Sequence, residues 1–222
     1  MTKAAPETAP SLQGKTQREG NMTYRTFLLG SLVLAGLAAG AATHQASAQN
    51  AATGGWVTLL DGKDMNNFTA VGDANWRVAE GAVVADKGKG GFLVTKNPYT
   101  DFQIRAEFWV DDEANSGIFI RCSDAKTIGG MNCYEVNIFD KRPGPEYGTG
   151  AIVNVAKVDP MPHAGGKWNV MEIDARGPYM SVTLNGQRTV NAVRDAKHPS
   201  GYFALQYGAG IVKFRKVEVR PM

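Results

Sequence analysis

The nine residues FQIRAEFWV, 102–110, alternate between two kinds of position along their whole length. The even-numbered positions are all apolar, and the odd-numbered positions carry Gln103, Arg105, Glu107 and Trp109. Successive side chains of a β-strand point to opposite faces of the sheet, so a period of two predicts a half-buried strand. The stretches GIFIRC (117–122) and YEVNIFD (134–140) show the same pattern, which predicts two more strands of this kind.

Short runs of this type continue from Trp56 to the C-terminus, and turn signals separate them about every 8–12 residues. Glu80-Gly81 and Asn185-Gly186 predict hairpin turns, and DKRPGPEYGT (140–149) predicts a proline- and glycine-rich loop. The chain has 26 glycines and 10 prolines. No convincing helix is visible beyond the N-terminal region. The sequence therefore predicts one all-β domain over residues 54–222.

The first 48 residues have a different character. A polar, patternless segment is followed by Arg25, an apolar run over residues 27–42 and the small residues Ala46-Ser47-Ala48. This order is typical of a secretory signal, so we expect an N-terminal extension with a signal peptide over residues 1–48, cleavage before Gln49 and a short linker over 49–53. Met22 is a more ordinary start than Met1. A permanent membrane anchor is the alternative, although the run is short for a spanning helix.

The charge balance speaks against a nucleic-acid partner. The whole chain holds 24 basic and 21 acidic residues, of which residues 1–48 contain four and two, leaving 20 and 19. We find no basic cluster with interleaved aromatic residues, which a nucleic-acid surface would need. We expect a periplasmic or secreted protein that does not contact the membrane after signal cleavage.

The outward positions of the three strands gather chemically useful side chains. We expect these three consecutive strands to lie side by side, so that one sheet face carries Gln103, Arg105, Glu107, Trp109, Phe119, Arg121, Glu135, Asn137 and Phe139. Aromatic rings stack on sugar rings, and planar polar groups hydrogen-bond to hydroxyls, so this face would suit carbohydrate. The alternative is a solvated sheet face with cross-strand ion pairs.

Motifs along nearly the whole of residues 54–222 resemble one family. They include WVTLLDGKDMNNF, NWRVAEGAVVA, NSGIFIRC, YEVNIFD, GTGAI, GKWNVMEI, VTLNGQ and GYFALQYG, in this order. The chain resembles the 3-keto-disaccharide hydrolase domain family. This resemblance implies a concanavalin-like jelly-roll sandwich of two curved antiparallel sheets, with a sugar site on the concave face. It also implies action on 3-keto-glycosides, by hydrolysis or by elimination followed by hydration.

Such chemistry assigns candidate roles. A C3 ketone acidifies the hydrogen on C2, so the reaction needs a general base, a group that stabilises the enolate and an acid for the leaving group. Glu135 or Glu107 is the candidate base, and Arg121 or Arg105 the candidate oxyanion partner. Further candidates for substrate binding are Trp109, Asn115, Ser116, Asn137 and His163.

Several alternatives stay open at this stage. Glu107 and Arg121 could form a simple cross-strand ion pair, and two carboxylates could act as in ordinary glycosidases. A carbohydrate-binding module without catalysis, or an interaction domain, could share the fold. Carboxylates together with arginines favour the enzyme. No histidine, cysteine or aspartate cluster has metal-ligand spacing, so a cofactor is unknown, and a divalent cation such as calcium remains an option.

Cys122 and Cys133, the two cysteines of the chain, flank the loop SDAKTIGGMN (123–132). Export to an oxidising compartment makes a disulfide between them plausible. Opposed residues of an antiparallel ladder have a constant sum of numbers. Pairing Cys122 with Cys133 gives a sum of 255, and pairing Arg121 with Glu135 gives 256, so one unbroken ladder cannot hold both. We expect the face pattern to hold and the disulfide to require a bulge or diverging strand ends.

Overall fold

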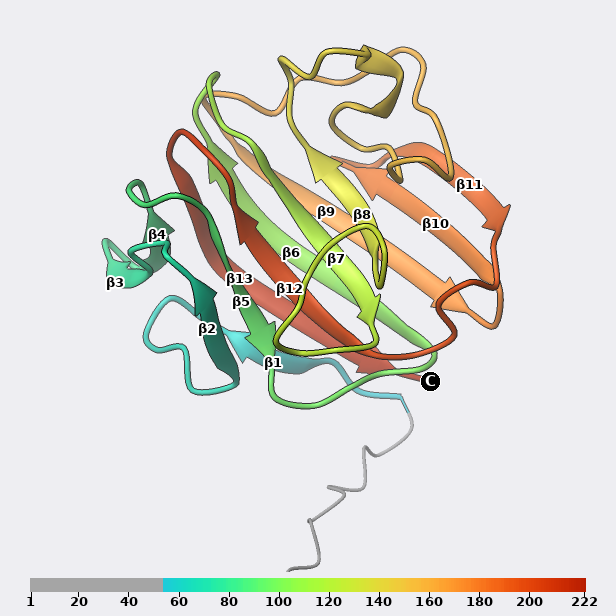
Figure 1. Ribbon diagram of the computed structural model, residues 1–222, viewed down its shortest axis with the longest axis horizontal. Helices are drawn as coiled ribbons and strands as arrows, with labels where there is room; N and C mark the ends of the chain where they lie inside the picture. The colour runs from blue at the N-terminus through green and yellow to red at the C-terminus, as the bar shows by residue number, and fades with distance from the viewer. Residues whose placement is uncertain (1–53) are drawn as a thin grey trace, which may run out of the picture. The chain divides into compact units, whose positions relative to one another are not determined.

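The computed structural model describes residues 54–222, which form two antiparallel β-sheets packed face to face (Figure 1). The larger sheet has eight strands in the order β11-β10-β9-β6-β13-β4-β3, with β1 also paired to β13. Its strands are β1 (Val57–Leu60), β3 (Arg77–Ala79), β4 (Ala82–Ala85), β6 (Phe102–Val110), β9 (Trp168–Arg176), β10 (Tyr179–Leu184), β11 (Gln187–Arg194) and β13 (Val212–Pro221).

The smaller sheet has five strands in the order β2-β5-β12-β7-β8. These strands are β2 (Phe68–Gly72), β5 (Gly91–Thr95), β7 (Ser116–Cys122), β8 (Tyr134–Ile138) and β12 (Tyr202–Tyr207). Apart from a single 3₁₀ turn at Pro145–Tyr147, the described residues contain no helix. The predicted all-β sandwich is confirmed.

The core lies between the two sheets and follows the predicted alternation. On β6 the even-numbered side chains are buried and the odd-numbered ones are half-buried. On β8, Tyr134, Val136 and Ile138 join the same core cluster from the opposite sheet. Burial of these side chains fixes which face of each strand points inward, because a slip of one residue would expose the whole apolar set.

Both predicted hairpins are present. Glu80 and Gly81 connect β3 to β4 with φ values of 53° and 72°, and Asn185 and Gly186 connect β10 to β11 with 51° and 82°. Two consecutive residues with positive φ give the tight turn whose twist matches that of the flanking strands.

Cys122 and Cys133 form the predicted disulfide, with their Cα atoms 4.3 Å apart. Neither predicted ladder is right, however. Phe119 pairs with Glu135 and Ile120 with Tyr134. The ladder through Cys122 and Cys133 would instead place Ile120 opposite Glu135, and the ladder through Arg121 and Glu135 would place it opposite Val136. The strand changes register at Arg121, which has φ 54°. On its other side β7 changes register against β12 between Phe119 and Cys122, which indicates an extra residue on β7. This bulge moves Cys122 to the outer face, where it packs beside Phe119.

The predicted extension, signal peptide and linker lie in residues 1–53, outside the described part of the chain. Between residues 54 and 222, no helix combines the length and the apolar character that crossing a bilayer requires.

Candidate functional site

The polar surface predicted from the sequence divides between two faces. Strand β6 pairs with β9 and β13, so Arg105, Glu107 and Trp109 lie on the outer face of the eight-stranded sheet. Strand β7 pairs with β8 and β12, so Phe119 and Glu135 lie on the outer face of the five-stranded sheet. The expectation of one shared surface is therefore wrong: the chain crosses from one sheet to the other between β6 and β7.

Glu135 occupies a row of side chains that crosses the five-stranded sheet. Phe119 is its neighbour on β7, and Ala204 follows on β12. The next row runs from Asn137 on β8 to Gly117 on β7, and continues through Gln206 on β12 to Phe92 on β5. The rings of Phe92 and Phe119 meet edge to face, with their centroids 5.3 Å apart. An apolar aromatic pair thus borders a polar patch.

The Glu135 carboxylate is half-buried and unpaired. Within residues 54–222 it has no hydrogen bond or salt bridge. Burial raises the pKa of the Glu135 carboxyl above its ordinary value, and the positive charge of Arg142 opposes that rise. A carboxylate with a raised pKa is a stronger base in its ionised form, a property that general bases in enzymes share.

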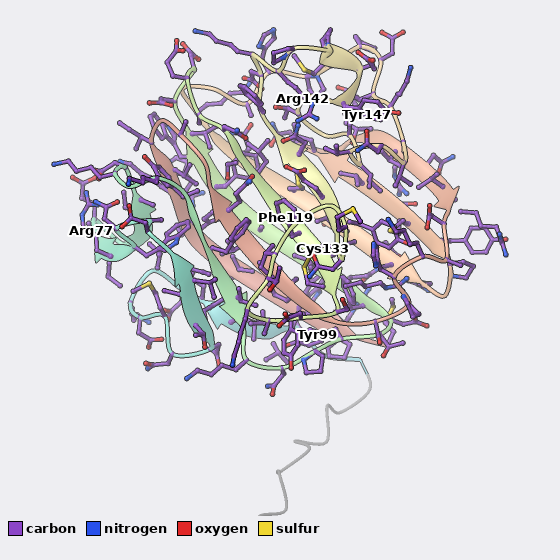
Figure 2. The ribbon with its side chains drawn as sticks, viewed as in Figure 1. Arg77, Tyr99, Phe119, Cys133, Arg142 and Tyr147 are labelled. Carbon is purple, nitrogen blue, oxygen red and sulfur yellow. A yellow bond between two sulfur atoms is a disulfide. The ribbon has the colours of Figure 1, made fainter. Side chains whose placement is uncertain are left out.

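Arg142 belongs to the loop that follows β8. Figure 2 shows Arg142 and Tyr147 near the end of β8, on the side of the molecule that also displays Phe119 and Cys133. Arg142 is half-buried and makes no salt bridge within residues 54–222. Its guanidinium therefore remains able to pair with charge that develops beside Glu135.

Asp140 and Asn137 fasten this loop. The Asp140 carboxylate accepts hydrogen bonds from the backbone N–H groups of Ala164 and Gly165, both at 2.9 Å, and from the Thr149 hydroxyl at 2.5 Å. The Asn137 side-chain amide donates to the Tyr147 carbonyl at 2.7 Å. These bonds hold both ends of the segment that carries Arg142.

Gly117 leaves space between two functional side chains. A Cβ atom at this position would lie 3.3 Å from Gln206 Oε1 and 3.5 Å from Glu135 Cγ, and 3.1 Å from the Val136 carbonyl oxygen. The side chains of Gln206 and Glu135 therefore converge over Gly117. The Gln206 Oε1 and Asn137 Oδ1 atoms are buried and have no hydrogen-bond partner among the described residues. Buried acceptors without partners are costly, so their presence in this patch marks it as unusual.

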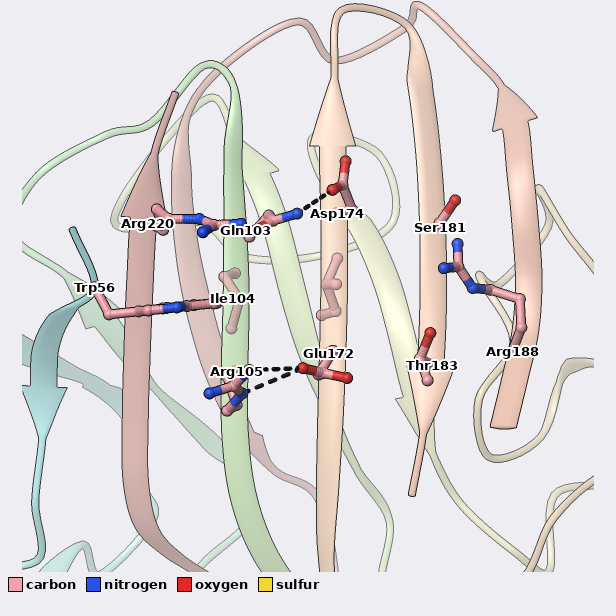
Figure 3. A pocket seen from close by; sticks show the side chains of 11 residues that line it. Trp56, Gln103, Ile104, Arg105, Glu172, Asp174, Ser181, Thr183, Arg188 and Arg220 are labelled. Carbon is pink, nitrogen blue, oxygen red and sulfur yellow. Dashed lines mark hydrogen bonds and ion pairs between the residues drawn. The ribbon is translucent and has the colours of Figure 1, made fainter. Parts of the chain in front are cut away.

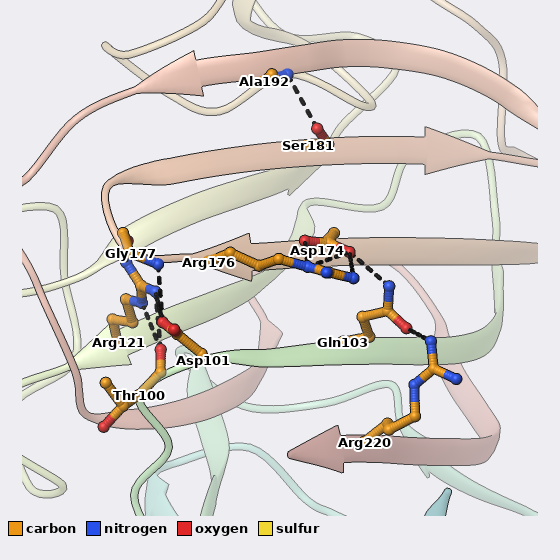
Figure 4. Close-up of polar contacts among 10 residues, drawn as sticks. All are labelled: Thr100, Asp101, Gln103, Arg121, Asp174, Arg176, Gly177, Ser181, Ala192 and Arg220. Atoms are coloured by element: carbon orange, nitrogen blue, oxygen red, sulfur yellow. Dashed lines mark hydrogen bonds and ion pairs between the residues drawn. The ribbon is translucent and has the colours of Figure 1, made fainter. Parts of the chain in front are cut away.

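Arg121 does not lie beside Glu135. Its side chain is fully buried and donates to the carbonyl oxygens of Thr100, at 2.8 and 3.1 Å, and Gly177, at 2.6 Å (Figure 4). It also donates to the Asp101 carboxylate at 3.2 Å. The bulge explains this position, because it turns Arg121 away from the outer face that regular alternation would give it. Arg121 thus ties together three chain segments at one end of the sandwich.

Three further residues predicted to bind substrate, Asn115, Ser116 and His163, have partners other than Glu135. Ser116 is buried and donates to the Gln206 carbonyl at 2.7 Å. The Asn115 backbone pairs with Ala209, so it fixes the start of β7 to the end of β12. His163 is 79% exposed, and its Nδ1 lies 3.6 Å from Asp140. Among the described residues, none of these three side chains makes a hydrogen bond or an ion pair with Glu135; Ser116 supports the strand that carries Gln206.

The residues of β6 form cross-strand pairs, which is the alternative the sequence left open. Glu107 accepts from Arg215 at 2.5 Å, not from Arg121. Arg105 pairs with Glu172 at 3.0 Å, and the ring of Trp109 lies 5.2 Å from the Lys213 ammonium. Pairs of this kind on an exposed sheet face are ordinary surface features.

Sequence reasoning missed Arg142, Gln206, Gly117 and Phe92. Gln206 had a signal, since it is a polar residue within the apolar run GYFALQYG. Arg142 follows YEVNIFD by two residues, but loop side chains have no periodicity from which a direction can be predicted.

The possible metal ligands of the described residues are their acidic, histidine and cysteine side chains. Among residues 54–222, no group of three or more histidine, cysteine, aspartate or glutamate side chains is close enough to hold a metal ion. We derive no chemical step through a metal.

Solved structures with a similar fold indicate the class of protein to which this chain belongs. Two candidate glycosyl hydrolases from Parabacteroides distasonis share the fold, with TM-scores of 0.60 and 0.62 and identities of 23% and 16%. Each alignment covers 76% of this chain, and 100% and 94% of the respective relative. The carbohydrate-binding module CBM66 from Bacillus subtilis aligns with a TM-score of 0.51 and 16% identity, over 75% of this chain and 95% of the module. The fold is thus a lectin-like jelly roll found in carbohydrate-related proteins.

The family follows from the sequence. Residues 55–220 match the 3-keto-alpha-glucoside-1,2-lyase-like domain, and the chain belongs to this family. A search of curated proteins finds no significant sequence match.

Proposed function

We propose that this protein cleaves 3-keto-glycosides by elimination, with Glu135 as the general base. The observation that carries the proposal is the half-buried carboxylate of Glu135, which has no hydrogen bond or ion pair among residues 54–222. Burial raises its pKa, and the positive charge of Arg142 opposes that rise. Family membership supports the substrate class, since the family is described by a 1,2-lyase activity on 3-keto-α-glucosides.

The proposed reaction has a simple balance. Glu135 takes the proton from C2, and the electron pair of that C–H bond forms an enolate with the C3 ketone. The C3 carbonyl then re-forms, the electron pair between C2 and C3 moves to form a C1–C2 double bond, and the bond from C1 to the glycosidic oxygen breaks. That oxygen leaves as an alcohol after it receives a proton. A water molecule supplies that proton in our proposal, and the protonated Glu135 returns its proton to the resulting hydroxide, so the carboxylate is regenerated. Addition of water to the double bond would complete a net hydrolysis.

Arg142 is proposed to stabilise the enolate oxygen. A guanidinium is always charged near neutral pH and offers several donors in a plane, which suits an oxyanion. The half-buried Gln206 supplies a polar side chain in the same patch, and the half-buried Phe92 ring offers an apolar border against which a sugar ring can pack. Gly117 keeps the space between Gln206 and Glu135 free of a side chain.

The geometry speaks against a glycosidase that uses Glu135 and Glu107 together. Two packed sheets lie about 10 Å apart, and these glutamates project outward from opposite sheets, so their separation is larger still. Paired glycosidase carboxylates lie about 5–9.5 Å apart. One carboxylate with one cation fits proton abstraction next to a ketone better.

A non-catalytic sugar-binding module is the second candidate. The half-buried Phe92 ring, which packs edge to face on the buried Phe119, favours it, because an aromatic ring beside an amide is sufficient for sugar binding. The two candidates differ in what they do to the substrate, and one experiment separates them.

That experiment follows the C2 hydrogen by NMR in deuterated water. Purified protein is incubated with methyl 3-keto-α-glucoside and, separately, with methyl α-glucoside. We expect release of methanol and deuterium at C2 only for the keto sugar. Binding of both sugars without exchange or release would establish the binding module and overturn the enzyme.

We also propose that the protein is exported, with a signal peptide cleaved before Gln49. The Cys122–Cys133 disulfide supports an oxidising compartment. N-terminal sequencing of material from the periplasm or medium tests this, and a chain that still begins before residue 42 would contradict it.

A further inference from the structure

Two polar rows cross the outer face of the eight-stranded sheet, on the side opposite Glu135. The strand pairing places Arg220, Gln103, Asp174 and Ser181 next to one another in the first row. The second row consists of Glu218, Arg105, Glu172, Thr183 and Arg188. Both rows face away from the core.

A cavity of 310 Å³ opens over these rows (Figure 3). Its volume is at the small end of ligand sites, which suits one or two sugar residues. Trp56 closes one side: its ring lies between Arg105 and Arg220, whose guanidinium carbons are 4.7 and 5.1 Å from the ring centroid. Arg188 reaches in from β11 on the other side, next to Ser181 and Thr183.

The carboxylates of this cavity already have partners. Glu172 accepts from Arg105 at 3.0 and 3.2 Å. Asp174 accepts from the Gln103 amide and from Arg176 (Figure 4), and Gln103 in turn accepts from Arg220. Glu172 and Asp174 are the two acidic residues that line the cavity, against three arginines, so the lining carries one excess positive charge.

Arg188 carries that excess. Within residues 54–222 it makes no salt bridge and no side-chain hydrogen bond. The Thr183 hydroxyl opposite to it is also without a partner there, and the Ser181 hydroxyl accepts from the Ala192 N–H but has no acceptor of its own. One free guanidinium thus lies beside two hydroxyls that can still donate.

We propose that this cavity binds a saccharide that carries a carboxylate. The planar guanidinium of Arg188 matches a carboxylate with two parallel hydrogen bonds. The Ser181 and Thr183 hydroxyls and the Oε2 atom of Glu172, which accepts no hydrogen bond from Arg105, then bind the sugar hydroxyls. This site is separate from the Glu135 face, and it would hold an acidic glycan to the protein while the opposite face acts on its substrate.

Calorimetric titration tests the site with two probes, a 1,4-linked galacturonate disaccharide and the neutral galactose disaccharide of the same linkage. Neither probe has a 3-keto group, so binding is measured without turnover, and Glu135→Gln should bind the acidic probe like the wild type. We expect Arg188→Gln to weaken the acidic probe by about tenfold or more, the loss expected for one charge-assisted pair. Added salt should weaken it as well.

Arg194→Gln is the matched control, since it removes the same charge from an exposed residue on β11 that does not line the cavity. It should change the affinity by less than about twofold. Equal affinity for the neutral probe, no binding of the acidic probe, or an Arg188→Gln affinity equal to the wild type would each overturn the proposal.

Discussion

Glu135 and Glu107 project from opposite outer faces of the sandwich, Glu135 from β8 and Glu107 from β6. Glu107 is bound to Arg215, whereas Glu135 has no partner among residues 54–222. The ion pair of Glu107 is typical of a surface residue, whereas the burial of Glu135 and its raised pKa are typical of a general base. The proposed chemistry places the reaction on the face of Glu135 alone.

The acid limb of kcat/KM should reflect the ionisation of Glu135. Only the carboxylate can accept the C2 proton, so activity should rise with pH through a pKa above the ordinary glutamate value of 4.5. The charge of Arg142 lowers this pKa, so Arg142→Gln should shift the acid limb of the kcat/KM profile to higher pH and reduce turnover. Arg142→Lys keeps the charge and should give an acid limb closer to that of the wild type. A limb unchanged in Arg142→Gln would contradict the pairing of Arg142 with Glu135.

Replacement of Glu135 should also change stability, in a direction that depends on pH. The folded protein binds the Glu135 proton more tightly than the unfolded chain does, so this residue's contribution is favourable below the unfolded pKa. That contribution is lost as pH rises from the unfolded pKa of 4.5 through the raised folded pKa. Glu135→Gln should therefore raise Tm at pH 7 relative to the wild type, with a smaller gain at pH 4. A lower Tm at pH 7 would argue that the carboxylate stabilises the fold.

Arg121 should prove structural. Its guanidinium is buried, and its hydrogen bonds to Thr100, Gly177 and Asp101 cannot all be kept by a lysine. Arg121→Lys should lower the free energy of unfolding by about 2–4 kcal/mol, measured by urea denaturation. The folded variant should keep the C2 exchange rate of the wild type. A lost exchange rate at unchanged stability would return Arg121 to the catalytic candidates.

The disulfide should stabilise the segment that covers part of the candidate site. Residues 123–132 cross in front of β7 and β8 in Figure 1, and Ala125 and Ile128 pack against the cluster of Phe119 and the two cysteines. Closing a loop of this length stabilises the fold by about 3 kcal/mol. The Cys122→Ser/Cys133→Ser variant should lose about that amount in denaturant unfolding. Thiol titration of the unfolded wild type should detect no free sulfhydryl, and two reactive thiols would refute the bridge.

The sequence predicted the strands well because their alternation is set by burial. The inward side chains of β6 and β8 and the turn at Asn185-Gly186 all follow from local patterns. Alternation does not say which sheet a strand joins, however, since both sheets bury one face in the same way. For this reason Glu107 and Glu135 were placed on one surface when they belong to two.

Two further features depend on contacts between distant residues. The positive φ of Arg121 is unusual for a residue with a side chain, and the hydrogen bonds of its guanidinium to Thr100 and Gly177 accompany it. The direction of Arg142 depends on the bonds that Asp140 and Asn137 make across the loop. Neither set of partners can be recognised from spacing along the chain.

The most direct test of the central claim compares C2 hydrogen exchange in Glu135→Gln and Glu107→Gln on methyl 3-keto-α-glucoside. Both changes remove one carboxylate and keep the side-chain shape, but only the first removes the proposed base. The account predicts that Glu135→Gln binds the sugar and exchanges its C2 hydrogen about 10²–10⁴-fold more slowly, while Glu107→Gln stays close to the wild type. Near-wild-type exchange in Glu135→Gln, with or without a loss in Glu107→Gln, would contradict it.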